Sequence, residues 1–248
     1  MKLFEKIFEK IATFIALALA KGAIDKTPEV LKNIAEWWNG KSIAVIGPTA
    51  SGKNSMFNRF KHQAPPEEHV QTRGAEQVGK FNINWTLPDS TTFNMTCKKS
   101  INVGGELDER ERYWLQSCNQ ADVIFYLIDG EKLVSDSEKT LFRIKDDLRW
   151  IVRQIHSFKP NVVVHLLVNK VDYFVKDVAF ENSQKIISEK LLEEIKIIED
   201  ISRKILGSYF KKITGIGPIS MLDDFLFKAY FTEALQQIQL ANTSNQKK

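Results

Sequence analysis

The chain contains little cysteine, little net charge and no long uncharged apolar run. Its two cysteines, Cys97 and Cys118, have neither metal-ligand nor redox spacing, so we expect buried reduced thiols and a reducing, cytoplasmic compartment. The formal net charge of +4 is too small to indicate a nucleic-acid partner, and no basic cluster lies beside aromatic residues. The 248 residues are enough for one large domain with appendages. We therefore expect a globular protein that binds no nucleic acid.

The longest uncharged stretch, Ile11 to Ala20, is about half of what a membrane-spanning helix requires. It lies in residues 1–24, where apolar residues recur at helical spacing and lysine and glutamate occupy the opposite face. Two interpretations stay open for this segment: a helix that packs on protein, or an amphipathic anchor that lies on a membrane surface and makes the protein membrane-peripheral. A second short helix is expected over 27–38.

One stretch, Ser42 to Ser55, organises the rest of the chain. An apolar run over 43–46 predicts a buried strand, a G-x-x-x-x-G-K motif follows, and the next residues are helical in pattern. In such a loop, backbone N–H groups and the helix N-terminus face phosphate oxygens, and the lysine reaches the terminal phosphates. A chance glycine-rich turn is the alternative, but the flanking strand and helix argue against it. The expected phosphate-binding residues are Gly47, Thr49, Ala50, Ser51, Gly52, Lys53, Asn54 and Ser55.

Buried strands and amphipathic helices alternate along the chain after this loop. Strands are expected at 122–128, 161–168 and 210–219. Helices are expected at 107–118, 137–158, 181–206 and 222–240. Two further strands, 78–87 and 93–103, predict an antiparallel hairpin at a sheet edge.

This pattern predicts an α/β fold with a mostly parallel, six-stranded sheet and helices on both faces. We assign the sheet to residues 41–240, an N-terminal helical segment to 1–40 and a disordered tail to 241–248. Polar motifs follow the predicted strands at Ile46, Val103, Val168 and Ile219. Because ligands of parallel sheets bind at the carboxyl ends of the strands, we expect these motifs to meet in one site.

Four motifs occur in a characteristic order: GPTASGKN at 47–54, Thr72, NVGGE at 102–106 and NKVD at 169–172. Together they resemble a Ras-superfamily small GTPase, and NVGGE is similar to the DVGGQ motif of the Arf-like branch. The resemblance covers roughly residues 41–240 and implies the P-loop GTPase fold. It also implies GTP or GDP as ligand, Mg²⁺ as cofactor, and effector or regulator proteins that contact residues 66–77 and 104–116.

The resemblance also implies roles for single residues. The Asp172 carboxylate would accept two hydrogen bonds from guanine, a pattern that adenine lacks, and Asn169 and Lys170 would brace the base and the loop. Ser220 and Met221 resemble the weakly defined motif at the guanine oxygen. The residues assigned to the reaction are Lys53, Thr72, Gly105 and Glu106. The residues assigned to the metal are Asn54, Thr72 and Asn102.

Three of these positions depart from the family pattern. Asn54 stands in place of the Mg²⁺-binding hydroxyl, Asn102 in place of an aspartate, and Glu106 in place of the glutamine that positions water. Neutral residues at the metal weaken its binding, and a carboxylate beside the terminal phosphate repels it. All three departures predict weak Mg²⁺ affinity and slow hydrolysis.

The sequence therefore predicts a guanine-nucleotide-binding switch protein that hydrolyses GTP to GDP slowly. It would be membrane-peripheral if residues 1–24 form the amphipathic anchor, and not if they form a helix that packs on protein. The main alternative is a pseudo-GTPase that hydrolyses nothing and acts as a protein-binding scaffold. A membrane-associated structural protein, in which residues 1–24 dominate, is a third interpretation. An ATPase or nucleotide kinase is a fourth, and it requires the NKVD motif to be accidental.

Overall fold

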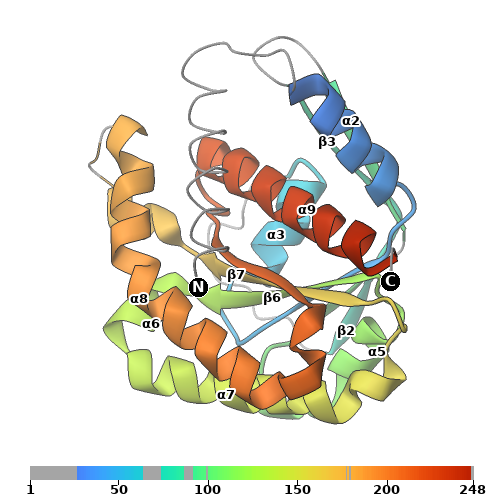
Figure 1. Cartoon of the computed structure of the whole chain (residues 1–248), viewed down its shortest axis with the longest axis vertical. Helices are drawn as coiled ribbons and strands as arrows, with labels where there is room; N and C mark the ends of the chain where they lie inside the picture. The colour runs from blue at the N-terminus through green and yellow to red at the C-terminus, as the bar shows by residue number, and fades with distance from the viewer. Residues whose placement is uncertain are drawn as a thin grey trace.

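A six-stranded sheet forms the centre of the computed structural model, which describes residues 27–63, 74–86, 92–98, 100–176, 178 and 180–246 (Figure 1). Its strand order is β2-β5-β1-β6-β7-β8. The strands are β1 (Ile43–Ile46), β2 (Ala75–Val78), β5 (Ser100–Val103), β6 (Val123–Asp129), β7 (Val163–Asn169) and β8 (Ile213–Pro218). All neighbours are parallel except the edge strand β2, which pairs antiparallel with β5. The mostly parallel, six-stranded sheet predicted from the sequence is confirmed.

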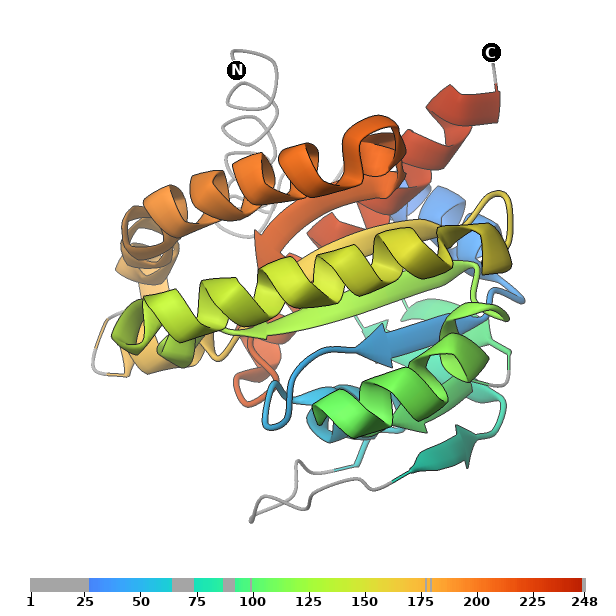
Figure 2. The same ribbon diagram turned by 90° about the horizontal axis from the view of Figure 1, so that it is seen from below.

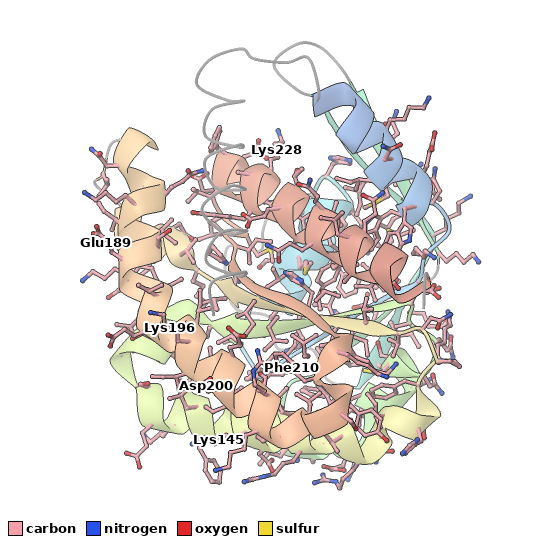
Figure 3. The ribbon with its side chains drawn as sticks, viewed as in Figure 1. Lys145, Glu189, Lys196, Asp200, Phe210 and Lys228 are labelled. Carbon is pink, nitrogen blue, oxygen red and sulfur yellow. The ribbon has the colours of Figure 1, made fainter. Side chains whose placement is uncertain are left out.

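Helices on one face of the sheet cover the larger hydrophobic cluster. They are α5 (Leu115–Cys118), α6 (Gly130–Ser135), α7 (Ser137–Gln154) and α8 (Phe180–Leu206). Trp114 and Trp150 are fully buried here with their rings edge to face, 5.5 Å apart. Figure 2 shows α7 and α8 side by side, in agreement with their contacts. Charged side chains such as Glu189, Lys196 and Asp200 lie along α8 on its exposed surface (Figure 3).

The opposite face is covered by α2 (Thr27–Trp38), α3 (Lys53–Phe60) and α9 (Asp224–Gln246), together with a hairpin of β3 (Phe81–Thr86) and β4 (Thr92–Cys97). Trp38, at the end of α2, is fully buried and its ring is stacked on Phe125 of β6, 6.1 Å away. The helix expected over 27–38 therefore contributes to the same hydrophobic cluster as the central strands.

The segment 107–118 is helical, as expected, but its middle turn differs from an α-helix. Residues 107–109 form α4, residues 110–114 form a π-helical turn, and α5 follows. Turns of this kind are frequent at functional sites. This helix begins at Leu107, directly after the NVGGE segment, which connects it to the end of β5.

Several expectations about element boundaries were wrong. The strand expected over 210–219 begins only at Ile213, after a 3-10 helix, and the one expected over 78–87 is interrupted between β2 and β3. The return strand expected over 93–103 is divided, because β4 pairs with β3 in a separate two-stranded sheet, whereas β5 enters the main sheet. The division falls at the exposed Lys98, since a charged residue cannot enter a strand as fully buried as β5. The final helix, expected to end near Leu240, continues to Gln246, so the tail expected over 241–248 is helical through residue 246.

Both cysteines are buried free thiols, as expected, and burial raises the pKa of Cys97 and of Cys118. No helix among the residues that the structure describes is long and apolar enough to cross a membrane. The amphipathic helix expected over residues 1–24 lies outside the described residues.

Candidate functional site

The predicted phosphate-binding loop joins β1 to α3 at the carboxyl end of the central strand. Three of its residues have left-handed backbone angles: Gly47 (φ 143°), Ala50 (φ 64°) and Gly52 (φ 99°). A Cβ at Gly47 would approach the Leu127 carbonyl oxygen to 2.4 Å, so any side chain there would displace the neighbouring strand. The loop therefore has the tight backbone geometry that turns several N–H groups toward one point.

Lys53, the first residue of α3, lies across this loop. Its Nζ donates hydrogen bonds to the carbonyl oxygens of Gly47, at 3.0 Å, and Pro48, at 2.8 Å. The side chain is only 6% exposed. Burial, together with the nearby Arg143 guanidinium, lowers the pKa of Lys53 to about 7. A phosphate bound in the loop would add negative charge beside this buried amine and favour its charged form.

The turn Gly104–Glu106, in the NVGGE motif, lies directly on the phosphate-binding loop. A Cβ at Gly105 would come within 2.4 Å of the Thr49 amide nitrogen and 2.6 Å of the Lys53 Nζ. The Thr49 hydroxyl donates a hydrogen bond of 2.8 Å to the Glu106 carboxylate. The structure thus brings Thr49 of the phosphate-binding loop together with Lys53, Gly105 and Glu106, three of the four residues that the sequence assigned to the reaction.

The two residues predicted to replace metal ligands contact each other. Asn102 Nδ2 donates a hydrogen bond of 2.9 Å to Asn54 Oδ1, so the Asn54 oxygen is already engaged by an amide N–H. Both residues are neutral, whereas protein Mg²⁺ sites rely on one or two carboxylates besides the phosphates. No group of three histidine, cysteine, aspartate or glutamate side chains that could hold a metal occurs among the described residues. The side chains at positions 54 and 102 do not fit a tightly held Mg²⁺.

The residues predicted for the base lie at the ends of β7 and β8. Asp172 accepts a hydrogen bond of 2.6 Å from the Ser220 hydroxyl, which orients its carboxylate. The Asn169 side chain donates to the Ser51 carbonyl at 2.9 Å and accepts from the Met221 amide at 3.2 Å. The NKVD motif, the phosphate-binding loop and the segment after β8 are therefore joined by one amide side chain.

Lys170 has a left-handed backbone angle of 66°, which turns the chain sharply between Asn169 and Asp172. Its Nζ is paired with the Asp129 carboxylate at 2.6 Å, and the same carboxylate accepts from the Lys132 amide at 3.1 Å. Asp129 thereby fixes the NKVD turn to the end of β6. Asp129 was not among the predicted site residues, although it is an acidic residue at the carboxyl end of β6.

Two buried polar atoms within the site have no hydrogen-bond partner among the described residues: Ser51 Oγ and Asn102 Oδ1. Ser51 is fully buried and Asn102 is 4% exposed. Buried polar groups in native proteins almost always have a partner, so unpaired ones indicate a functional role or a bound group. Their position supports the interpretation of this region as a ligand site.

A model of the Gtr1/RagA G protein conserved region matches residues 42–243, most of the chain. The chain belongs to this G-protein family. The match includes all the motifs above and confirms the predicted class of small GTPase. The assignment to the Arf-like branch stays a prediction, as do the roles of the single residues.

Relatives match parts of this Gtr1/RagA-family chain. GTPase Der from Nitratiruptor sp. is 27% identical over 138 residues, which cover 53% of this chain and 26% of that protein. The tRNA modification GTPase MnmE from Malacoplasma penetrans is 22% identical over 231 residues, covering 84% of this chain and 49% of that protein. The chain thus spans about a quarter to a half of the length of these relatives.

Among solved structures, the signal recognition particle receptor SRb-GTP/SRX complex from Chaetomium thermophilum is similar, with a TM-score of 0.48 and 13% identity. The similarity covers 79% of this chain and 98% of that chain.

Sequence reasoning missed an ionic cluster that joins α7 of this G protein to the turn over the phosphate-binding loop. At its centre is Asp147, which is fully buried and accepts from Arg110 Nη1 at 2.7 Å, Tyr126 Oη at 2.8 Å and Arg143 Nε at 2.9 Å. Burial, and next the charge of Asp147, raise the pKa of Tyr126. The available signal was an aspartate on the apolar stripe of α7, three residues after Ile144.

Arg59, on α3, was also missed. Its Nε donates to the Met221 carbonyl at 2.7 Å, its Nη2 donates to the Leu222 carbonyl, and its Nη1 contacts Asp224 at 3.1 Å. The helix that begins at the phosphate-binding loop thus holds the segment beside Asp172. The sequence gives no signal for this contact, because both carbonyl groups belong to the main chain.

Thr72, predicted for the metal and the terminal phosphate, lies outside the described residues, as does most of the predicted partner segment 66–77. Its described end contacts the other predicted partner segment, 104–116. The Gly74 amide donates to Glu109 at 2.7 Å, and the Gly74 carbonyl accepts from the Gly104 amide at 3.1 Å. The two segments therefore meet at one edge of the G protein.

Proposed function

We propose that the protein binds GDP and GTP as a molecular switch and hydrolyses GTP to GDP slowly. The observation that carries this proposal is the position of Asp172 beside the phosphate-binding loop. Asn169, in the same NKVD motif, binds this loop through a hydrogen bond to the Ser51 carbonyl. A nucleotide that spans both places would have its phosphates at Lys53 and its base at Asp172.

Guanine is the base whose chemistry matches this site. One Asp172 oxygen is held by Ser220, and an ionised carboxylate retains further lone pairs for hydrogen bonds. Guanine presents a ring N–H and an exocyclic amine on one edge, and both can donate to a carboxylate. Adenine presents a ring acceptor there, which a carboxylate repels. We therefore expect steep selection against adenine nucleotides.

Competition against a fluorescent guanine nucleotide, mant-GDP, tests this selection with unlabelled GDP, IDP, XDP and ADP. We expect GDP to compete best and IDP, which lacks the exocyclic amine, to compete more weakly. In the Asp172→Asn variant, the ratio of the affinity for XDP to that for GDP should rise by on the order of a hundredfold, because xanthine presents an acceptor to the new amide. Asp200→Asn, on the exposed surface of α8, is the matched control. Equal competition by ADP and GDP would refute selection of guanine, and stronger competition by ADP than by GDP would establish the ATPase or nucleotide kinase alternative.

Slow hydrolysis is supported by the residues around the terminal phosphate. Asn54 and Asn102 contact each other and supply no negative charge for a metal, and Glu106 is an acid where water has to be positioned. Small GTPases that lack a partner arginine already turn over at roughly 10⁻⁴ s⁻¹, so a small further loss abolishes detectable turnover. Phosphate release from GTP, lost in Lys53→Ala, would support hydrolysis.

The second candidate is a pseudo-GTPase that holds nucleotide and acts as a scaffold. The contact between Asn54 and Asn102 favours it, because a site without a fitting metal binds nucleotide more readily than it cleaves it. Bound GTP that stays intact over hours, even with cell extract added, would support this candidate and exclude the enzyme.

We also propose that effectors or regulators bind residues 66–77 and 104–116. The hydrogen bonds between Gly74, Gly104 and Glu109 support this, because a change at the phosphate-binding loop would reach both segments together. Residues 1–24 would hold the protein at the surface of a membrane on its cytoplasmic side. Flotation with liposomes tests the anchor: loss of flotation in a chain without residues 1–24 supports it, and equal flotation refutes it.

A further inference from the structure

The turn Gly104–Glu106 lies where a third phosphate would have to be placed. We propose that Glu106 is a specificity-determining residue that makes the site selective for guanosine diphosphate over guanosine triphosphate. This inference rests on the proposed function, since it concerns which guanine nucleotide the same site prefers. In this arrangement the Glu106 carboxylate is a negative charge of the protein itself that competes with the terminal phosphate for the same groups of the loop.

The backbone at Gly105 leaves little space over the loop. A Cβ there would lie 2.4 Å from the Thr49 amide nitrogen, 2.5 Å from the Pro48 carbonyl carbon and 2.6 Å from the Lys53 Nζ. The Gly105 Cα is therefore already in contact with the loop backbone and with the lysine. Backbone N–H groups such as that of Thr49, and the lysine, bind the phosphates in a loop of this kind, so a third phosphate can enter only if the turn moves away.

Several hydrogen bonds hold the turn in this place. The Trp114 indole donates to the Gly104 carbonyl at 2.9 Å, and the Arg143 guanidinium donates to the Gly105 carbonyl at 2.9 Å. The Gly104 amide donates to the Gly74 carbonyl at 3.1 Å. Trp114 is fully buried, so its hydrogen bond is shielded from water. A ligand that moves the turn away would have to compensate for these bonds.

Charge adds a second barrier to the triphosphate. The Glu106 carboxylate accepts a hydrogen bond of 2.8 Å from the Thr49 hydroxyl and is close enough to attract the Lys53 ammonium electrostatically. A terminal phosphate at this place would lose the Thr49 hydroxyl to Glu106 and would meet a carboxylate of like charge. A diphosphate has no group at this place, so the hydrogen bond between Glu106 and Thr49 of the loop can remain. The carboxylate therefore opposes the triphosphate and tolerates the diphosphate.

The test compares the affinities of the full-length, nucleotide-free protein for mant-GDP and for the non-hydrolysable mant-GppNHp, with and without Mg²⁺. We expect the wild type to bind mant-GDP at least about tenfold more tightly than mant-GppNHp. In Glu106→Gln, which keeps an acceptor for Thr49 but removes the charge, mant-GppNHp should bind about tenfold more tightly with little change for mant-GDP. Asp108→Asn is the matched control, since it removes the same charge from an exposed position two residues further along.

The outcomes separate this inference from the proposed function. A ratio of the two affinities that is the same in wild type and Glu106→Gln overturns the inference, and so does equal binding of both nucleotides by the wild type. Either result leaves guanine binding intact. A wild-type protein that binds neither nucleotide, although folded by circular dichroism, overturns the proposed function and the inference with it. If the ratio of the affinities for mant-GDP and mant-GppNHp decreases in both Glu106→Gln and Asp108→Asn, the effect comes from general surface charge. That result also overturns the inference.

Discussion

The Arg143 guanidinium donates a hydrogen bond of 2.9 Å to the Gly105 carbonyl, which joins helix α7 to the turn over the phosphate-binding loop. The same guanidinium is fixed from its other side by Asp147, whose carboxylate also binds Arg110 on the helix after that turn. The NVGGE turn and the first part of the next helix are therefore attached to α7 through one buried carboxylate.

Asp147→Asn should destabilise the fold by about 3–5 kcal/mol, because it leaves two arginines beside a buried neutral group. Urea denaturation measures the loss. Asp146→Asn is the matched control: Asp146 also binds Arg110, at 2.7 Å, but its side chain is 32% exposed, so we expect a loss of about 1 kcal/mol or less. Equal losses in the two variants would show that burial of Asp147 is not what makes its ion pairs important.

Arg59→Ala should accelerate release of mant-GDP by about tenfold or more, because the segment at Met221 and Leu222 loses its hold on α3. Arg59→Lys should not restore slow release, since an ammonium cannot bind two carbonyl groups and Asp224 in the same fork. Arg149→Ala, on the exposed side of α7, is the control with the same change of charge. Stopped-flow fluorescence gives the rates; equal release from all four proteins would refute this role of Arg59.

Restoring the family residues at the metal, with Asn54→Thr and Asn102→Asp together, should make nucleotide binding depend on Mg²⁺. A hydroxyl and a carboxylate are better Mg²⁺ ligands than two amides that bind each other. We expect removal of Mg²⁺ with EDTA to weaken mant-GDP binding by about tenfold or more in the double variant and by less than about threefold in the wild type. Equal dependence in the two proteins would contradict the assignment of these positions to the metal.

Because of Glu233 on α9, we expect the free energy of unfolding to decrease from weakly acidic to weakly alkaline pH. Burial raises its pKa from the ordinary 4.5 to about 7, although Gln237 donates a hydrogen bond to it. The folded state therefore binds the proton more tightly than the unfolded chain. The stabilisation is complete below about pH 4.5 and is lost as the pH rises through 7.

Glu233→Gln should remove this dependence and be more stable than the wild type at pH 8, by on the order of 2 kcal/mol. Urea denaturation at pH 5 and pH 8 gives the difference, and the comparison within each pH cancels the other titrating groups. Glu189→Gln, exposed on α8, should change neither value. A parallel loss of stability in Glu233→Gln and wild type between the two pH values would show that Glu233 is not responsible.

The phosphate-binding loop and the buried parallel strands could be predicted because their physical requirements are local. A left-handed turn needs glycine at Gly47 and Gly52, and a parallel strand buried on both faces is apolar throughout, as in β6. Such requirements appear directly in the spacing and type of neighbouring residues. The meeting of the motifs at one edge then follows from the parallel sheet.

The contacts that hold the site together could not be predicted in this way. Arg59 binds main-chain carbonyl groups that lie far along the chain, and a carbonyl leaves no trace in residue type. Asp147 occupies a position on the buried side of α7, but its partners Arg110 and Tyr126 come from two other elements. The division of the return strand likewise depends on which partner strand is available, not on the pattern of the segment itself.

The Asn169 side chain has a consequence for local unfolding. It binds the Ser51 carbonyl on one side and the Met221 amide on the other, and its Nδ2 would lie 2.1 Å from a Cβ at Gly52. Opening either loop alone would leave a buried amide unpaired, at roughly 1–3 kcal/mol. The phosphate-binding loop and the base segment should therefore open as one cooperative unit, and hydrogen exchange of their backbone amides should give one common free energy of opening.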